Sequence, residues 1–171
     1  TSDEVRVVVS IDGNEIGLDA PLERDHDAPA EDLLVHAANL DRNVLLQSET
    51  GEIKRRAHVM FMHTHDVDCR HVRIHRLGRT DKRVQVDDWF FPNLDAELAE
   101  PGPATNRRGR YSIHFHRGGV DPSVPGVGRI ERCVVEDDPG WAYVNHSSHV
   151  DFFENVSYNV VGGAFQTESG D

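Results

Sequence analysis

The chain consists largely of short runs in which apolar and polar residues alternate, and such runs are typical of half-buried β-strands. Asp12-Gly13-Asn14 separates the first two runs and predicts a turn between them. Almost no segment has the apolar spacing of an amphipathic helix, so we expect an all-β fold. The runs are residues 5–11, 15–18, 43–46, 58–62, 67–69, 72–74, 111–115, 130–135, 142–144, 150–153 and 156–160.

Three of these regions resemble one another, and their similarity indicates how the strands are arranged. Residues 67–74, 130–135 and 150–158 each place apolar residues at alternate positions, with a polar corner between two strand pieces. A repeat of about 20 residues with polar corners is typical of a right-handed parallel β-helix. We therefore expect one β-helix domain over residues 1–171, with a loop insertion at about 79–110. A β-sandwich is the alternative, although it requires hairpin turns that the chain shows convincingly only once.

Residues 110–119, R-Y-S-I-H-F-H-R-G-G, place two histidines on one face of a predicted strand. Ile113 and Phe115 point to one side of this strand, and His114 and His116 point to the other. The chain has eleven histidines, and equivalent positions of stacked parallel strands lie about 4.8 Å apart. We therefore expect a column that contains His63, His114 or His116, and His146. Imidazole nitrogens are the ligands that zinc and other transition metals prefer.

The composition limits the partners of the protein. A net charge of −12, with lysine only at positions 54 and 82, argues against nucleic acid. The arginines at positions 107, 108, 110 and 117 are suited instead to a carboxylate or sulfate group. No window is apolar enough for a membrane span, and the first residues do not look like a signal peptide. Cys69 and Cys133 lie in apolar surroundings and are expected to be buried free thiols.

The order of several motifs resembles a known family. Residues 110–116 (R-Y-S-I-H-F-H) resemble the R-Y-P-I-H-F-H motif of the extracellular domain shared by fibrocystin and the cell-surface hyaluronidases, with serine in place of proline. Further similarities lie at residues 40–44 (L-D-R-N-V against L-T-R-N-V), 58–62 (H-V-M-F-M against H-I-M-I-M), 77–78 (L-G against M-G), 144–146 (V-N-H against V-x-H), 158–159 (Y-N) and 165–170 (F-Q-T-E-S-G against F-x-T-E-D-G). The resemblance implies a β-helix at the cell surface or outside the cell. It also implies an acidic, hyaluronan-like polysaccharide as the partner, and a longer polypeptide of which this chain is a part.

The resemblance and the residue pattern together give a candidate site. Its expected catalytic residues are His116, His146 and Glu168. The expected metal ligands are His63, His114, His116 and His146, with zinc as the first choice of ion. The expected substrate-binding residues are Arg110, Arg117, Trp89 and Asn159, of which Trp89 lies in an aromatic run, W-F-F, within the insertion. Two classes of function stay open: a polysaccharide hydrolase or lyase, and a non-catalytic β-helix that binds carbohydrate or metal or is purely structural.

Overall fold

The computed structural model describes residues 3–64, 66–90, 100–121, 123 and 127–168. The chain divides into two compact units, Thr1–Asn39 and Leu40–Asp171. The first unit contains an antiparallel pair, β1 (Val8–Asp12) and β2 (Glu15–Leu18), joined at Gly13. Gly13 has a φ of 58°, which glycine adopts without strain and which closes the turn that the sequence predicts. Glu4 anchors the loop that follows β2, because its carboxylate accepts hydrogen bonds from the amides of Glu23 and Arg24.

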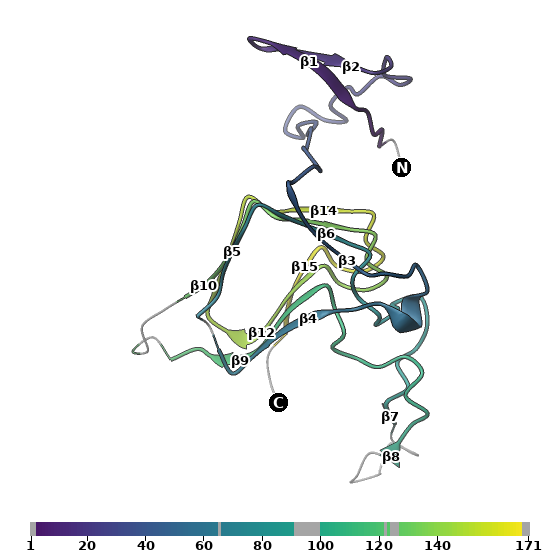
Figure 1. Cartoon of the computed structure of the whole chain (residues 1–171), viewed down its shortest axis with the longest axis vertical. Coiled ribbons are helices and arrows are strands. Elements are labelled where there is room, and N and C mark those ends of the chain that lie inside the picture. The colour runs from purple at the N-terminus through teal and green to yellow at the C-terminus, as the bar shows by residue number, and fades with distance from the viewer. Residues whose placement is uncertain (1–2, 65, 91–99, 122, 124–126, 169–171) are drawn as a thin grey trace. The chain divides into compact units, whose positions relative to one another are not determined.

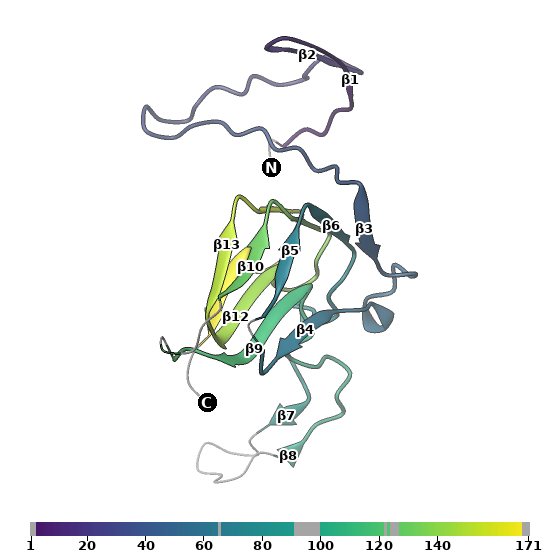
Figure 2. The same ribbon diagram turned by 60° about the vertical axis from the view of Figure 1, so that its left-hand side comes forward.

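The second unit is built of parallel strands in three sheets (Figures 1 and 2). The first sheet has the order β13–β10–β5, with strands Val150–Phe153, Gly128–Glu131 and Asp68–Arg70. The second has the order β14–β11–β6–β3, with strands Val156–Tyr158, Val134–Glu136, Val72–His75 and Val44–Gln47. The third has the order β15–β12–β9–β4, with strands Phe165–Glu168, Tyr143–Ser148, Ile113–Gly119 and Val59–Met62.

Sharp bends carry the chain from one sheet to the next. His71, Arg132 and Glu154 lie between β5 and β6, between β10 and β11, and between β13 and β14, and each has a φ between 51° and 55°. Their amides continue the stacking, since His71 N–H donates to the Glu131 carbonyl and Arg132 N–H donates to the Phe153 carbonyl. The bends turn alternate side chains of all three sheets toward a common core, which includes Ile74, Phe115, Ile130, Val135 and Tyr143.

The expectation of a single right-handed parallel β-helix over the whole chain is wrong. The structure is mostly strand with almost no helix, and the one helical element among the described residues is the 3-10 turn η1 (Ile53–Arg55). The parallel strands form separate sheets of four, four and three strands, and residues 8–18 form an antiparallel hairpin. β3 and β4 are edge strands of the two four-stranded sheets, whereas the three-stranded sheet ends at β5 and has no corresponding fourth strand among the described residues. Alternation along a strand specifies its two faces, whereas its partner strand is decided by contacts between distant segments.

The segment between β6 and β9 leaves the parallel sheets. It contains an antiparallel pair, β7 (Trp89–Phe90) and β8 (Glu100–Pro101), and its two ends return to the same place. Arg79 and Thr80 N–H both donate to the Arg110 carbonyl, at 2.8 and 3.2 Å. The buried amide of Asn106 fastens the segment further by donating to the carbonyls of Asp81, Val84 and Gln85. The two ends of this segment therefore lie beside the start of β9.

No helix in the described part of the chain has the length and apolar character needed to cross a membrane.

Candidate metal site

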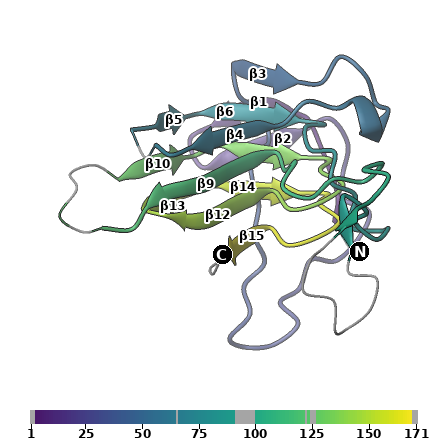
Figure 3. The ribbon, with the colours of Figure 1, turned by 90° about the horizontal axis from the view of Figure 1, so that it is seen from below.

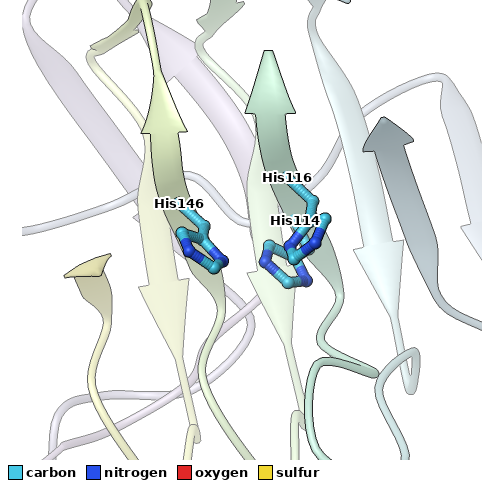
Figure 4. A group of neighbouring side chains, drawn as sticks. All are labelled: His114, His116 and His146. Atoms are coloured by element: carbon cyan, nitrogen blue, oxygen red, sulfur yellow. The ribbon is translucent and has the colours of Figure 1, made fainter. Parts of the chain in front are cut away.

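Three histidines meet on the outward face of the third sheet, whose four strands lie side by side in Figure 3. His114 and His116 are on β9, and His146 is on the neighbouring strand β12 (Figure 4). Alternation along β9 turns Ile113 and Phe115 into the core, so the two histidines project to the opposite side. Parallel pairing puts His146 directly beside His116. The sequence spacing and the register together account for the cluster.

The three rings are close enough to share a ligand. Each histidine offers one ring nitrogen, and these three nitrogens all lie within 4.8 Å of one another. The centroids of the His116 and His146 rings are 4.6 Å apart, and those of His114 and His116 are 5.2 Å apart. In a tetrahedral zinc site, ligand nitrogens about 2.0 Å from the ion lie about 3.3 Å from one another. The three nitrogens would have to adopt this spacing to bind one ion together.

His114 is held in the form that a metal ligand requires. Its side chain is 2% exposed, and its Nδ1 lies 3.0 Å from the carbonyl oxygen of Gly109. A carbonyl can only accept, so Nδ1 carries the proton and Nε2 carries the lone pair. That Nε2 is buried and has no hydrogen-bond partner. Ligand histidines commonly donate their second N–H to a carbonyl in this way, which fixes the ring and its tautomer.

Burial also keeps His114 neutral. Loss of hydration lowers the pKa of His114 to about 4, and the electrostatic effects of His116, His146 and Arg110 act in the same direction, against the bond to Gly109. His114 is therefore uncharged at neutral pH, with its lone pair available. Gly109 has a φ of 74° and lies close to the His114 ring, so a side chain at this position would be strained.

An aromatic and cationic group adjoins the histidines. The ring of Tyr111 lies 5.4 Å from that of His114 and 4.9 Å from that of Trp141. The ammonium group of Lys82 lies 3.4 Å from the centroid of the Trp141 ring, which is a cation–π contact. Burial lowers the pKa of Lys82, while the carboxylate of Glu168 opposes this effect. The electrostatic influence of Glu168 on Lys82 and Tyr111 places its carboxylate near this group.

Basic side chains also gather at the edge of the site. Arg79 and Arg110 are half-buried and joined through their backbones. Neither guanidinium has an ion pair with another described residue. His58 lies near both, and its pKa is lowered first by burial and then by the charges of Arg79 and Arg110. Half-buried like charges without a carboxylate are unusual in a protein of net charge −12 and are suited to an anion.

The structure brings together three of the four predicted metal ligands. His63 is not among them: it follows the end of β4, is exposed, and has a φ of 52°. Its backbone N–H donates to the His116 carbonyl, and Met62 occupies the position beside His116 instead. The register of the column was therefore off by one residue on β4. His65, the second histidine of the H-T-H sequence, lies outside the described residues.

The predicted catalytic and substrate-binding residues are distributed unevenly. Glu168 on β15 pairs in register with His146, so it continues the row of His116 and His146. Arg110 adjoins His114, whereas Arg117 is an exposed residue of β9 one position beyond His116. The amide of Asn159 donates to the Asp137 carboxylate at a bend after β14, which gives it a structural contact. Trp89 lies on β7, but its side chain and all of Phe91 fall outside the described residues.

Sequence reasoning missed four residues around the cluster, namely Arg79, Lys82, Gly109 and Trp141. Lys82 and Trp141 could have been noticed from the sequence because their residue types are rare: the chain has two lysines and two tryptophans. The backbone contact between Gly109 and His114 spans five residues across a bend and has no sequence signature.

No family model, curated protein or solved structure matches this chain.

Proposed function

We propose that the protein binds a transition-metal ion, zinc in the first instance, through His114, His116 and His146. The observation that supports this most strongly is the buried Nε2 lone pair of His114, whose tautomer is fixed by the Gly109 carbonyl. A buried polar atom without a partner costs free energy, and a bound cation would offset that cost. Three imidazoles suit zinc better than calcium or magnesium, which prefer oxygen ligands.

The fourth position of such a site would remain open to solvent or substrate. Structural zinc sites are usually closed by four protein ligands, whereas three-ligand sites leave room for water or another group. Glu168 is the nearest carboxylate along the row of paired residues, beside His146. Arg110 is close enough to influence the pKa of His114, so it could also act on an anion held beside the three histidines.

The ligand that we propose for this site is an acidic polysaccharide of the hyaluronan type. Arg79 and Arg110 are half-buried residues and support this choice, because arginine binds carboxylates with two parallel hydrogen bonds. Trp141, which packs on the buried Tyr111 ring, is partly exposed in the same region and supplies an aromatic surface. Binding, with or without cleavage of the chain, would place the protein outside the cell or at its surface.

Metal content is the experiment that tests the first proposal. The protein would be purified without chelator or metal-affinity resin, incubated with zinc, desalted and measured by elemental analysis. We expect about one zinc ion per chain, and its loss in a His114→Ala, His116→Ala double variant. His36→Ala is the matched control, since His36 is exposed and belongs to the other unit. Zinc retained by the double variant, or no zinc in the wild type, would refute the site.

Binding of hyaluronan oligosaccharides tests the second proposal. Isothermal titration of the zinc-loaded protein should show affinity that falls at least about tenfold in an Arg79→Ala, Arg110→Ala double variant, through the loss of charge-assisted hydrogen bonds. Arg107→Ala is the control, because Arg107 is exposed and does not adjoin His114. Equal affinities for the double variant and the control would exclude these arginines as the anion site and leave the metal site untouched.

A further inference from the structure

The two cysteines, 64 residues apart in sequence, meet inside the second unit. Their Sγ atoms are 3.9 Å apart, and both cysteines are free, as the sequence predicts. Cys69 lies in β5, and Cys133 lies in the bend between β10 and β11. They are not register partners, since Cys69 pairs with Ile130. The bend at Arg132 brings Cys133 back toward Cys69.

The bend holds Cys133 in place. The side-chain amide of Asn155 accepts a hydrogen bond from Cys133 N–H and donates one to the Ile130 carbonyl, each at 2.8 Å. Arg42 donates from Nε to the Arg132 carbonyl at 2.7 Å, on the same bend. Backbone fixed on both sides of Cys133 limits the separation of the two sulfur atoms to side-chain rotation.

The surroundings of the two cysteines favour a thiolate on Cys133 over one on Cys69. A hydrogen bond from the Cys69 thiol lowers the pKa of Cys133 to about 7, and the charge of Arg42 contributes in the same direction. The same hydrogen bond and burial raise the pKa of Cys69. The proton is shared across one sulfur–sulfur contact, so the titration belongs to the pair. Cys133 is fully buried, whereas Cys69 is half-buried and is the more accessible residue of the two.

We propose that Cys69 and Cys133 are a redox-active dithiol that closes to an intramolecular disulfide by exchange with a small-molecule disulfide such as oxidised glutathione. The Cys69 sulfur, deprotonated when the shared proton moves to Cys133, attacks the oxidant and forms a mixed disulfide, and one glutathione thiolate leaves. Cys133 loses its proton to that thiolate and attacks the Cys69 sulfur, and the second glutathione leaves as a thiolate that takes a proton from solvent. Two protein thiols are oxidised, and one glutathione disulfide is reduced to two thiols.

The disulfide would join strand β5 to the bend between β10 and β11 in the second unit. The sulfur atoms must approach from 3.9 Å to the bonded distance of about 2.0 Å. Closing a loop of this length reduces the freedom of the unfolded chain, and the oxidised protein should therefore melt about 10 °C higher. The histidine cluster is built by other strands, so this inference does not depend on metal binding.

The test is to expose the folded protein to oxidised glutathione, alkylate the remaining thiols in denaturant and measure the intact mass. We expect no alkylation, a mass about 2 Da below that of the reduced chain, and one cross-linked peptide that contains both cysteines. Cys133→Ser should instead accumulate a glutathione adduct at Cys69, because the resolving thiol is missing. Cys69→Ser should stay unmodified, because Cys133 is buried.

Several outcomes would overturn the proposal. They are two alkylated thiols in the treated wild type, a stable glutathione adduct on the wild type, and a disulfide between two chains in place of the internal one. Each is read from the wild-type protein by mass spectrometry, so the result does not depend on whether the serine variants fold.

Discussion

The two faces of strand β9 are both buried, yet they are chemically opposite. Ile113 and Phe115 face the core at 2% and 0% exposure, and His114 faces outward at 2%. The Phe115 ring packs on that of Phe61 at 4.8 Å, an ordinary apolar contact. His114 offers a lone pair that no other residue in the described part of the chain satisfies. Burial alone therefore does not identify a core, because a buried strand face can also carry polar side chains such as His114.

The largest expected effect comes from the inward face. Phe115→Ala should lower the free energy of unfolding by about 3–5 kcal/mol, because it leaves a cavity among fully buried side chains. Urea denaturation followed by circular dichroism measures this. Phe153→Ala is the control, since Phe153 on β13 is 46% exposed. If the two variants lost similar stability, the inward face of β9 would not be the core.

The outward face should contribute stability only when metal is present. Zinc at a hundred times its dissociation constant should raise the free energy of unfolding by about 2.7 kcal/mol, because it binds the folded state alone. The same addition should leave a His116→Gln variant unchanged. Thermal melts with and without zinc provide the measurement, and a chelator should reverse the shift. An equal zinc effect in the variant would show that binding occurs elsewhere.

The sequence predicts the strands and the two faces of β9, because alternation is a local rule. It also predicts the meeting of His114, His116 and His146, because the similarity between regions of the chain indicates parallel stacking. Those rules do not specify where a strand ends relative to its neighbour. His63 was placed in the column, but β4 ends at Met62, and His63 turns away at a positive φ. The Gly109 and Arg79 contacts depend on how a long segment folds back, which a sequence pattern of short runs does not encode. The number of sheets was missed for the same reason.

A smaller effect on stability is expected from Asp138, which forms hydrogen bonds with the backbone just before β9. Asp138 is 1% exposed, and its carboxylate accepts hydrogen bonds from the amides of Ser112 and Gly140. Burial raises its pKa to about 6, against the opposing effect of these hydrogen bonds. The folded state therefore binds the proton more tightly than the unfolded state. The stability that follows from this is fully present below the unfolded pKa of 3.8 and is lost as pH rises through about 6.

Between pH 7 and pH 5, this group alone should add about 1.4 kcal/mol to the stability of the protein. The measurement is the difference in unfolding free energy between the wild type and Asp138→Asn at the two pH values, which isolates Asp138 from the other carboxylates. A carbon-13 titration of the Asp138 carboxyl group serves as the second measurement, with a midpoint near 6 expected. A midpoint near 3.8 would contradict the burial argument.

The smallest effect is expected at His63. A variant at this position tests whether a histidine that lies near the cluster also binds the metal ion. His63 is next to Met62 in sequence and its N–H donates to the carbonyl of His116, yet its side chain is exposed. His63→Asn keeps the backbone hydrogen bond and tolerates the positive φ, so stability should change by less than about 0.5 kcal/mol. Zinc affinity, measured by competition with a chelating dye, should stay the same. A tenfold weaker affinity would mean that His63 reaches the ion when the site closes, and that the outward face recruits a fourth imidazole from the end of β4.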